Sequence, residues 1–275
     1  MADITVRPLA AGRAQMGLIP KVVQIWYCDI ISTNMQPTNH PYKRVLLKLS
    51  GEQFAGDREY GIDPNFVNRL AKELAETIEA TGVQLAIIVG GGNIMRGASV
   101  AKSGIERATG DYMGMMATLI NGMALCDILE NNGVHARLQT RLRADAVAEP
   151  YVRRRGLRHL EKGRVVVVAG GTGNPYVTTD TAAVTTALEL DCDVVLKATK
   201  VDGVYDKDPS KHDDAKKHDA LTFDKVLTNP EINVMDNAAI SLAMDNKLPI
   251  IVFDLLTQDN IRRVIQGEKV GTKVS

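Results

Sequence analysis

Three glycine-rich segments each follow an apolar run, and each has the make-up of an anion-binding loop. They are "KLSGE" (48–52), "GGGN" (90–93) and "GGTGNP" (170–175). Backbone N–H groups, small hydroxyls and a following helix N-terminus can bind a phosphate. The third segment matches neither the P-loop nor the dinucleotide-binding pattern. Tight turns alone would explain one such loop, but loops at the carboxyl ends of successive parallel strands are expected to converge on one site.

Two basic side chains lie next to these loops. Lys48 interrupts an aliphatic strand, and a buried unpaired ammonium costs several kcal/mol, so we expect it to meet an anion. The alternative is that Lys48 lies just past the sheet and extends to water. Arg96, four residues after Gly92, is placed to clamp phosphate oxygens, unless it is a surface arginine.

Acidic side chains follow two of the predicted strands. Asp180 stands at the predicted N-terminus of the helix after the third loop, where helix capping alone would explain it. Orienting a catalytic lysine is an equally compatible role. Asp202 and Asp208 lie in a loop after the strand 193–197, and Asp208-Pro209 is often simply a turn.

These glycine-rich loops provide two separate anion-binding sites. Together with a lysine and an arginine, they suggest two phosphorylated ligands that meet head to head. Phosphoryl transfer needs positioning and charge neutralisation more than a covalent group. No neighbouring Ser-His-Asp or Cys-His set competes with this interpretation, and the five histidines show no metal-ligand spacing.

The hydrophobic pattern predicts the elements that position these residues. Apolar strands are expected at 45–49, 85–89, 165–169, 193–197 and 250–253, with helices between them; Asp63 is the expected N-cap of the first long helix. Continuous apolar strands that alternate with helices predict an α/β fold with a mostly parallel sheet covered on both faces.

Composition excludes several classes of protein. The chain has 275 residues, 45% of them hydrophobic, and a formal net charge of zero, so charge gives no argument for nucleic-acid binding. No uninterrupted apolar run is long enough to predict a membrane span. Cys28, Cys126 and Cys192 form no C-x-x-C pair, which is typical of reduced thiols in a cytoplasmic protein.

Residues 1–40 differ from the remainder and are expected to form no part of the domain at 41–275. They show no clear period, and they lack the apolar region of a signal peptide. Either translation begins at Met35, or the segment is a disordered extension.

Several motifs, in order, resemble those of bacterial UMP kinases, which are members of the amino acid kinase superfamily. They are "YKRVLLKLSGE", "VGGGNIMRG", "GDYMGM", "GTGNPYVTTD" and "VVLKATKVDGVYDKDP". The resemblance covers roughly residues 42 to 275 and implies a three-layer α/β/α sandwich. It implies transfer of the γ-phosphoryl group of ATP to UMP with Mg²⁺ held mainly by ATP rather than by protein side chains. It also implies a cytoplasmic homohexamer that is activated by GTP and inhibited by UTP.

The resemblance assigns roles to residues on both sides of the site. Lys48 and Arg96 would act on the transferring phosphoryl group, and Asp180 would orient the lysine. The implied ATP contacts are Lys48, Leu49, Ser50, Gly51, Gly92, Arg96, Thr199, Tyr205 and Asp208. The implied UMP contacts are Gly91, Asp111, Thr172, Gly173, Asn174, Pro175, Tyr176, Val177, Thr178 and Thr179.

The sequence departs from the family pattern in two places. Val177 stands where a second aromatic residue is expected after Tyr176, and the segment 140–156 is more basic than usual, which puts effector control in doubt. Two alternatives remain open: a related enzyme that phosphorylates a carboxylate or carbamate, and a non-catalytic nucleotide- or anion-binding protein on the same fold.

Overall fold

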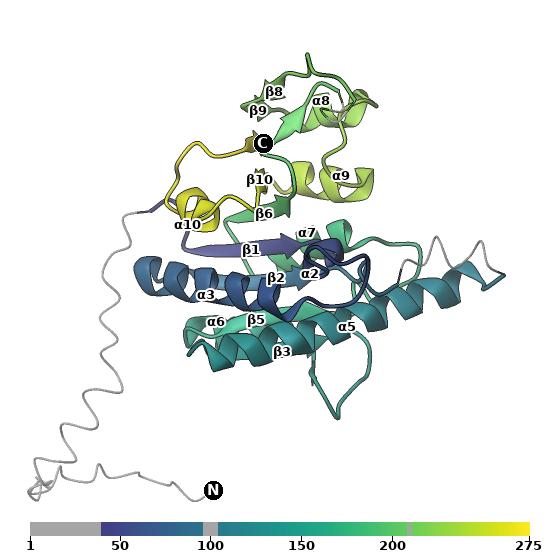
Figure 1. The fold of residues 1–275 in the computed structure, drawn as a ribbon, viewed down its shortest axis with the longest axis vertical. Coiled ribbons are helices and arrows are strands. Elements are labelled where there is room, and N and C mark those ends of the chain that lie inside the picture. The colour runs from purple at the N-terminus through teal and green to yellow at the C-terminus, as the bar shows by residue number, and fades with distance from the viewer. Residues whose placement is uncertain (1–39, 96–103, 208, 210) are drawn as a thin grey trace, which may run out of the picture. The chain divides into compact units, whose positions relative to one another are not determined.

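The computed structural model describes residues 40–95, 104–207, 209 and 211–275 (Figure 1). The described residues belong to one unit, Thr38–Ser275. Nearly all of the predicted N-terminal extension, together with Arg96 and Asp208, lies outside the described residues.

A single large sheet runs through the domain. Its strand order is β4-β3-β5-β2-β1-β6-β10-β11-β9, and every neighbouring pair is parallel except β10 and β11. The strands are β1 (Arg44–Leu49), β2 (Gln84–Val89), β3 (Ala136–Thr140), β4 (Glu149–Pro150), β5 (Val165–Ala169), β6 (Val194–Thr199), β9 (Ala220–Leu221), β10 (Ile250–Asp254) and β11 (Thr272–Val274). A separate two-stranded ribbon pairs β7 (Val204–Tyr205) with β8 (Lys217–His218).

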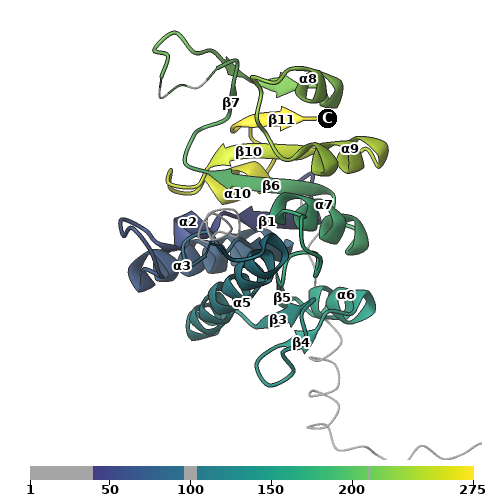
Figure 2. The same cartoon turned by 90° about the vertical axis from the view of Figure 1, so that its right-hand side faces the viewer.

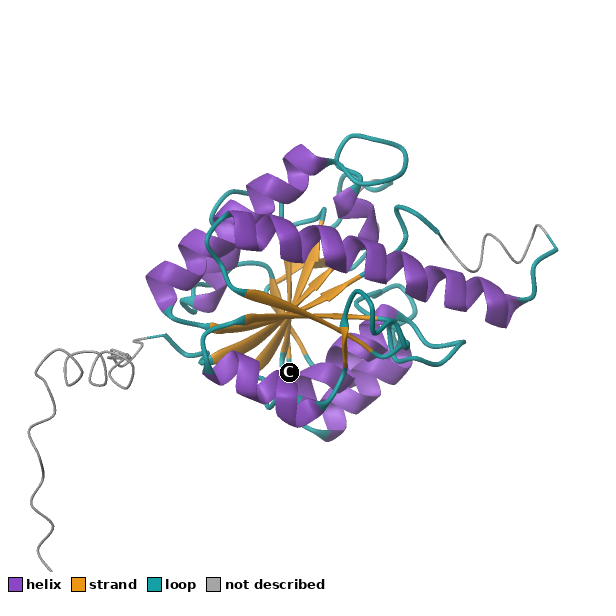
Figure 3. Cartoon of the chain, turned by 90° about the horizontal axis from the view of Figure 1, so that it is seen from below, coloured by secondary structure: helices purple, strands orange, loops and turns teal. Residues whose placement is uncertain are grey.

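Helices cover both faces of the sheet, as the views in Figures 2 and 3 show. The first face carries α2 (Gly51–Phe54), α3 (Pro64–Thr81), α5 (Arg107–Asn131) and α10 (Asn260–Ile265). The second face carries α6 (Arg153–Glu161), α7 (Thr179–Glu189), α8 (Phe223–Thr228) and α9 (Asn237–Asp245). The predicted three-layer α/β/α fold with a mainly parallel sheet is confirmed.

The alternation of side chains along β1 divides the core in two. Val45, Leu47 and Leu49 pack with α3, α5 and α10, whereas Leu46 packs with α6, α7 and α9. Successive side chains of a strand point to opposite faces, so Lys48 lies on the face of Leu46, which α7 covers.

The predicted elements agree with the observed ones apart from their ends. β5 has the predicted bounds, and Asp63 caps α3 by accepting a hydrogen bond from the Asn65 backbone N–H at 3.0 Å. β3 begins at Ala136, because Gly133 at φ 81° and the turn around it take up the residues before the strand.

Among the described helices, α5 is long and apolar enough, by length and composition, to cross a membrane. The core helix of a soluble protein passes the same test, and α5 buries Met115, Leu119, Leu125 and Leu129 inside this domain. Its apolar run is interrupted by Asp111 and Asp127.

Candidate active site

Lys48 lies within β1 and not beyond the end of the sheet. Only 8% of its surface is exposed, and its register partners are Ile88 on β2 and Lys197 on β6. The alternative in which this lysine extends to water is therefore wrong. A buried ammonium at this position needs an anionic partner.

That partner is Asp180, in the first turn of α7. Lys48 Nζ lies 2.9 Å from Asp180 Oδ1, and Lys197 Nζ lies 3.2 Å from Asp180 Oδ2. Lys197 also donates a hydrogen bond to the carbonyl of Val234. Two ammonium groups thus share one carboxylate at the carboxyl ends of β1 and β6.

The pKa shifts in this cluster follow from burial and charge. Burial acts to raise the pKa of the Asp180 carboxyl, but the ammonium groups of Lys48 and Lys197 outweigh it and the pKa is lowered. Burial lowers the pKa of Lys197, although the nearby Asp180 carboxylate acts to raise it. Asp180 is consequently ionised at neutral pH and orients both lysines, whereas the N-cap of α7 is Thr178.

The first two glycine loops touch each other beside this cluster. A Cβ atom added at Gly51 would lie 2.3 Å from the Gly92 backbone nitrogen, so only glycine permits this approach. A buried amide pair supports the second loop: Asn121 Nδ2 donates to Gly90 O and to Asn93 Oδ1, each at 2.7 Å. Asn121 belongs to α5, so this helix positions the loop.

The same helix holds the third glycine loop. The Gly170 backbone N–H donates to Thr118 Oγ1 at 2.8 Å, and the Tyr176 backbone N–H donates to Asp111 Oδ2 at 2.8 Å. Gly170 has φ 81°, a left-handed conformation that favours glycine. Predicted UMP contacts far apart in the sequence are thereby brought together at one end of α5.

The far end of the third loop is tied to α9. Thr178 Oγ1 donates to Asp236 Oδ2, and Thr181 Oγ1 donates to Asp236 Oδ1 at 2.8 Å. Asp236 is also the N-cap of α9, where it accepts from the Ala239 backbone N–H at 2.9 Å. Loop, α7 and α9 are therefore joined through one carboxylate.

The predicted ATP contacts lie along β1, β6 and the ribbon. Leu49 ends β1, and the Ser50 backbone N–H donates to Gln53 Oε1 at 2.9 Å at the start of α2. Thr199 ends β6, and its hydroxyl donates to Val201 O at 2.6 Å. Tyr205 lies on β7, where its hydroxyl donates to Asp202 Oδ1 at 2.6 Å. That hydrogen bond raises the pKa of Tyr205 and lowers that of Asp202.

The remaining predicted UMP contacts lie on the third loop and on the second. Thr172 and Asn174 hydrogen-bond each other at the loop tip, where Asn174 N donates to Thr172 Oγ1 at 3.3 Å. Gly173, Pro175, Val177 and Thr179 complete the segment, with Val177 exposed. Gly91 packs against α5, since a Cβ added there would lie 2.6 Å from Gly114 O.

A family profile, that of the amino acid kinase family, matches residues 43–254. The chain belongs to the amino acid kinase family. At 38% identity and a TM-score of 0.82, it is similar to the crystal structure of a UMP kinase from Bacillus anthracis, with 86% of this chain and 97% of that chain covered. A UMP kinase from Ureaplasma parvum is 33% identical at a TM-score of 0.79, covering 85% and 98% of the two chains. A uridylate kinase from Archaeoglobus fulgidus is 28% identical at a TM-score of 0.65, covering 84% and 99%.

Membership of the amino acid kinase family confirms the resemblance drawn from the sequence motifs. The glycine loops, Lys48 and Asp180 lie within the matched segment 43–254, and so does Lys197. The residue-by-residue roles are not tested by these likenesses and remain predictions. Arg96 and Asp208 lie outside the described residues of this amino acid kinase.

Sequence reasoning missed two members of the site, Lys197 and Asp236. Lys197 ends the apolar run "DVVLK", where a lysine ordinarily marks the end of a strand. The run "VVLKAT" in fact continues as strand to Thr199, and this continuation is the signal that could have identified a buried lysine. Asp236 stands in "VMDNAA", within the segment that resembles UMP kinases, but the sequence assigned it no role.

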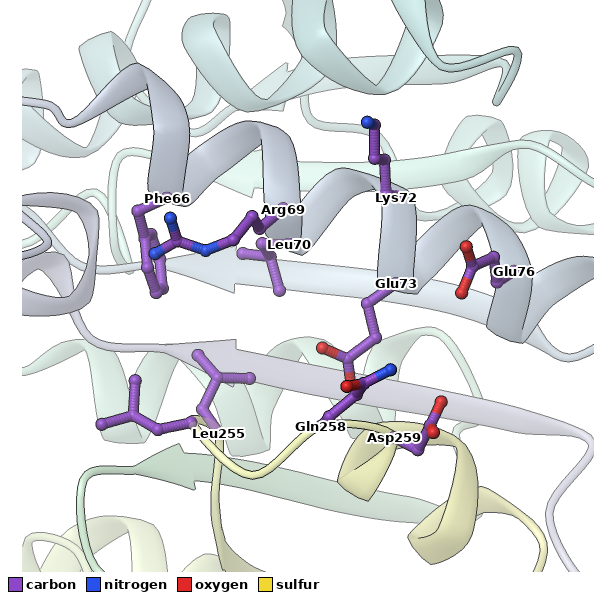
Figure 4. A pocket seen from close by; sticks show the side chains of 10 residues that line it. Phe66, Arg69, Leu70, Lys72, Glu73, Glu76, Leu255, Gln258 and Asp259 are labelled. Carbon is purple, nitrogen blue, oxygen red and sulfur yellow. The ribbon is translucent and has the colours of Figure 1, made fainter.

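A pocket of about 410 Å³ lies elsewhere in this amino acid kinase, between α3 and the segment 255–259 (Figure 4). Phe66, Leu70, Leu255 and Leu256 form its apolar part. The Glu73 carboxyl faces Gln258. None of the residues that line this pocket belongs to the lysine cluster or to a glycine loop, so we assign it no part in the site.

Proposed function

We propose that the chain is a UMP kinase, which transfers the γ-phosphoryl group of ATP to UMP and gives UDP and ADP. The observation that carries the proposal is the convergence of Lys48 and Lys197 on Asp180, beside two glycine loops that touch each other. Phosphoryl transfer chiefly needs positioned positive charge for the oxygens of the moving group, and this cluster supplies it.

In the proposed reaction, a phosphate oxygen of UMP attacks the γ-phosphorus and the bond from that phosphorus to the β–γ bridging oxygen breaks. The electron pair of that bond stays with ADP. The attacking oxygen belongs to a phosphate monoester, whose second pKa is about 6, so no side chain has to remove a proton. Asp180, with its lowered pKa, serves to hold the two lysines and not as a base.

We propose that Mg²⁺ accompanies ATP and is held mainly by its phosphates. The proposal rests on the resemblance to UMP kinases and on the chemistry of phosphoryl transfer, in which metal ions bridge phosphate oxygens. The ion would supply further neutralisation of the phosphates when it is bound. Lys48 and Lys197 would then neutralise the remaining charge.

A homohexamer is likewise a proposal, and one surface supports self-association in general. Four large apolar side chains are exposed on α5 at spacings of four, four and three residues: Tyr112 at 45%, Met116 at 50%, Ile120 at 48% and Met123 at 42%. This spacing puts them on one side of the helix. Light scattering will measure the oligomer size.

Control by GTP and UTP is proposed from the family resemblance alone. The basic segment 140–156 stands out: Arg141 stacks on Tyr151, 4.1 Å from its ring centroid, and pairs with Glu189 at 2.5 Å. These arginine contacts are internal to the subunit. Initial rates measured with and without GTP or UTP test the proposal directly.

A coupled assay with ATP and a panel of acceptors tests the main proposal. We expect UMP to be phosphorylated in preference to CMP and dUMP. Turnover of N-acetylglutamate or carbamate in place of UMP would identify a related carboxylate or carbamate kinase. Nucleotide binding without turnover of any acceptor would identify a non-catalytic binding protein.

A further inference from the structure

Three side chains form a closed set of contacts where α5 meets the third glycine loop. Arg107 Nε lies 2.9 Å from Asp111 Oδ1 and 3.0 Å from Asp111 Oδ2. The guanidinium carbon of Arg107 lies 5.8 Å from the centroid of the Tyr176 ring. The Tyr176 backbone N–H completes the set by donating to Asp111 Oδ2 at 2.8 Å. We refer to Arg107, Asp111 and Tyr176 as the acceptor clamp.

The backbone of Tyr176 needs such support. Its φ is 66°, in the left-handed region that side-chain-bearing residues adopt uncommonly. A residue keeps such a conformation only where surrounding contacts impose it. In this loop the contacts are the N–H bond to Asp111 and the guanidinium over the ring, and both depend on where Arg107 and Asp111 lie.

Arg107 also determines what Asp111 can still bind. An ionised carboxylate has about four lone-pair positions, and Arg107 and the Tyr176 N–H do not use them all. One position remains for a hydroxyl donor such as a ribose of the acceptor. The guanidinium neutralises Asp111, so this carboxylate does not repel a nucleotide phosphate nearby.

We infer that Arg107 is a positioning residue for the acceptor nucleotide. It holds the rotamer of the Asp111 side chain and, through Tyr176, the shape of the loop 172–179. The inference rests on the proposed function as far as the acceptor is UMP, but the clamp itself is a property of the ligand-free protein. Arg107 is 47% exposed and Asp111 only 14%, so replacing the arginine disturbs little of the core.

The chain offers a matched control in Arg69 on α3. Its guanidinium carbon lies 5.9 Å from the Phe66 ring centroid, a contact of the same kind at nearly the same distance. Arg69 takes no part in the hydrogen bonds described above for the glycine loops. Arg69→Ala therefore removes an arginine–aromatic contact without touching the clamp.

The test compares Arg107→Ala, Arg107→Lys and Arg69→Ala with the wild-type enzyme. Loss of a charge-assisted hydrogen bond typically changes affinity by about 10- to 100-fold, so we expect Arg107→Ala to raise the KM for UMP at least about tenfold. The KM for ATP and kcat should stay within about twofold of the wild-type values.

Lysine cannot contact both carboxylate oxygens and stack as a planar group, so Arg107→Lys should recover only part of the loss. Arg69→Ala should match the wild type in all three constants.

Amide hydrogen exchange on the ligand-free proteins gives a second readout that does not depend on activity. The Tyr176 amide should exchange faster in Arg107→Ala than in the wild type, and its exchange rate should be unchanged in Arg69→Ala.

Three results in Arg107→Ala would overturn the inference: an unchanged exchange rate of the Tyr176 amide, an unchanged KM for UMP in an active enzyme, or an equal rise in both KM values. A wild-type protein that leaves UMP unphosphorylated would instead refute the proposed function, and the exchange measurement would still decide whether the clamp exists. Should Arg107→Ala fail to fold, Arg107→Lys carries both measurements.

Discussion

Lys48 and Lys197 are register partners on the adjacent parallel strands β1 and β6, and both side chains reach the same carboxylate, Asp180. Like charges opposite each other in a sheet repel. Asp180 offsets that repulsion only in part, because one carboxylate faces two ammonium groups. A phosphorylated ligand bound beside Lys48 would reduce this repulsion further.

Replacing Lys48 removes one of the two charges. We expect Lys48→Ala to lower kcat by roughly 10²–10³ because it removes stabilisation of developing charge in the transition state. Circular dichroism should confirm an unchanged fold, and Lys72→Ala, at an exposed position on α3, is the control. A soluble, folded Lys48→Ala protein with near-normal turnover would contradict the role given to Lys48.

Lys197 was not identified from the sequence, so its variant tests what the structure adds. Lys197→Ala should lower kcat by roughly 10², since it also removes a cation held by Asp180. Lys162→Ala, at the exposed C-terminal end of α6, serves as the matched surface control. If only Lys48→Ala impairs turnover, Lys197 is merely a structural partner of Asp180.

Asp180 links the cluster to acid stability. The pKa of this carboxyl is lowered from 3.8 in the folded protein, so the folded state binds fewer protons than the unfolded state. Its contribution is fully present above about pH 4 and is lost as the pH falls through the folded pKa. We expect Asp180→Asn to cost about 3–5 kcal/mol of unfolding free energy at pH 7, because two buried ammonium groups lose their counterion.

Urea unfolding measures the contribution of Asp180 to the free energy of unfolding. Wild type and Asp180→Asn are compared between about pH 2.5 and 7, a range chosen to span this titration. The difference between the two proteins should shrink on the acid side. A difference that stays constant across the range would mean that Asp180 stabilises the fold by packing alone.

Glu73 has the opposite pH dependence. Burial raises its pKa from the ordinary value of 4.5 to about 7. The hydrogen bond from the Ile261 backbone N–H acts to lower this pKa but is outweighed. The folded state thus retains a proton that the unfolded state has lost, and stability falls as the pH rises from about 4.5 to 7. Glu73→Gln should flatten this decline, whereas Glu79→Gln, further along α3 and exposed, should leave it unchanged. Parallel slopes for wild type and Glu73→Gln would show that Glu73 titrates normally.

Asp111→Asn separates the two nucleotide sites. The change keeps the shape of the side chain but leaves Arg107 without its ion-pair partner. We expect the KM for UMP to rise and the KM for ATP to stay nearly constant in steady-state kinetics. A change confined to ATP would mean that the acceptor and donor sites have been assigned the wrong way round.

Local signals in the sequence were sufficient for the layers of the fold. Strand β5 is a run of valines, and Asp63 with Pro64 marks the start of α3, so period and capping decided both. The burial of Lys48 followed from its aliphatic neighbours, and the need for an anion followed from the burial. The very short strands β4, β7, β8, β9 and β11 were not foreseen, because two or three residues show no period.

The rest of the site depends on which strands are neighbours. Lys197 lies beside Lys48 only because β6 pairs with β1, although about 150 residues separate them. The same holds for Asp236, whose contacts with Thr178 and Thr181 join α9 to the third loop. Strand order is a non-local property, and no motif in either segment specifies it.

Helix α5 holds the second glycine loop through Asn121 and the third through Thr118, while Met116 and Ile120 are exposed on its surface. Because a helix is stiff along its length, a neighbouring subunit that pressed on this surface would tilt both loops at once. Both assembly and turnover would then depend on the position of helix α5. If the proposed self-association uses this face of α5, substitutions at Met116 or Ile120 that weaken it should for this reason alter catalysis as well, although neither residue belongs to the acceptor clamp or to the lysine cluster.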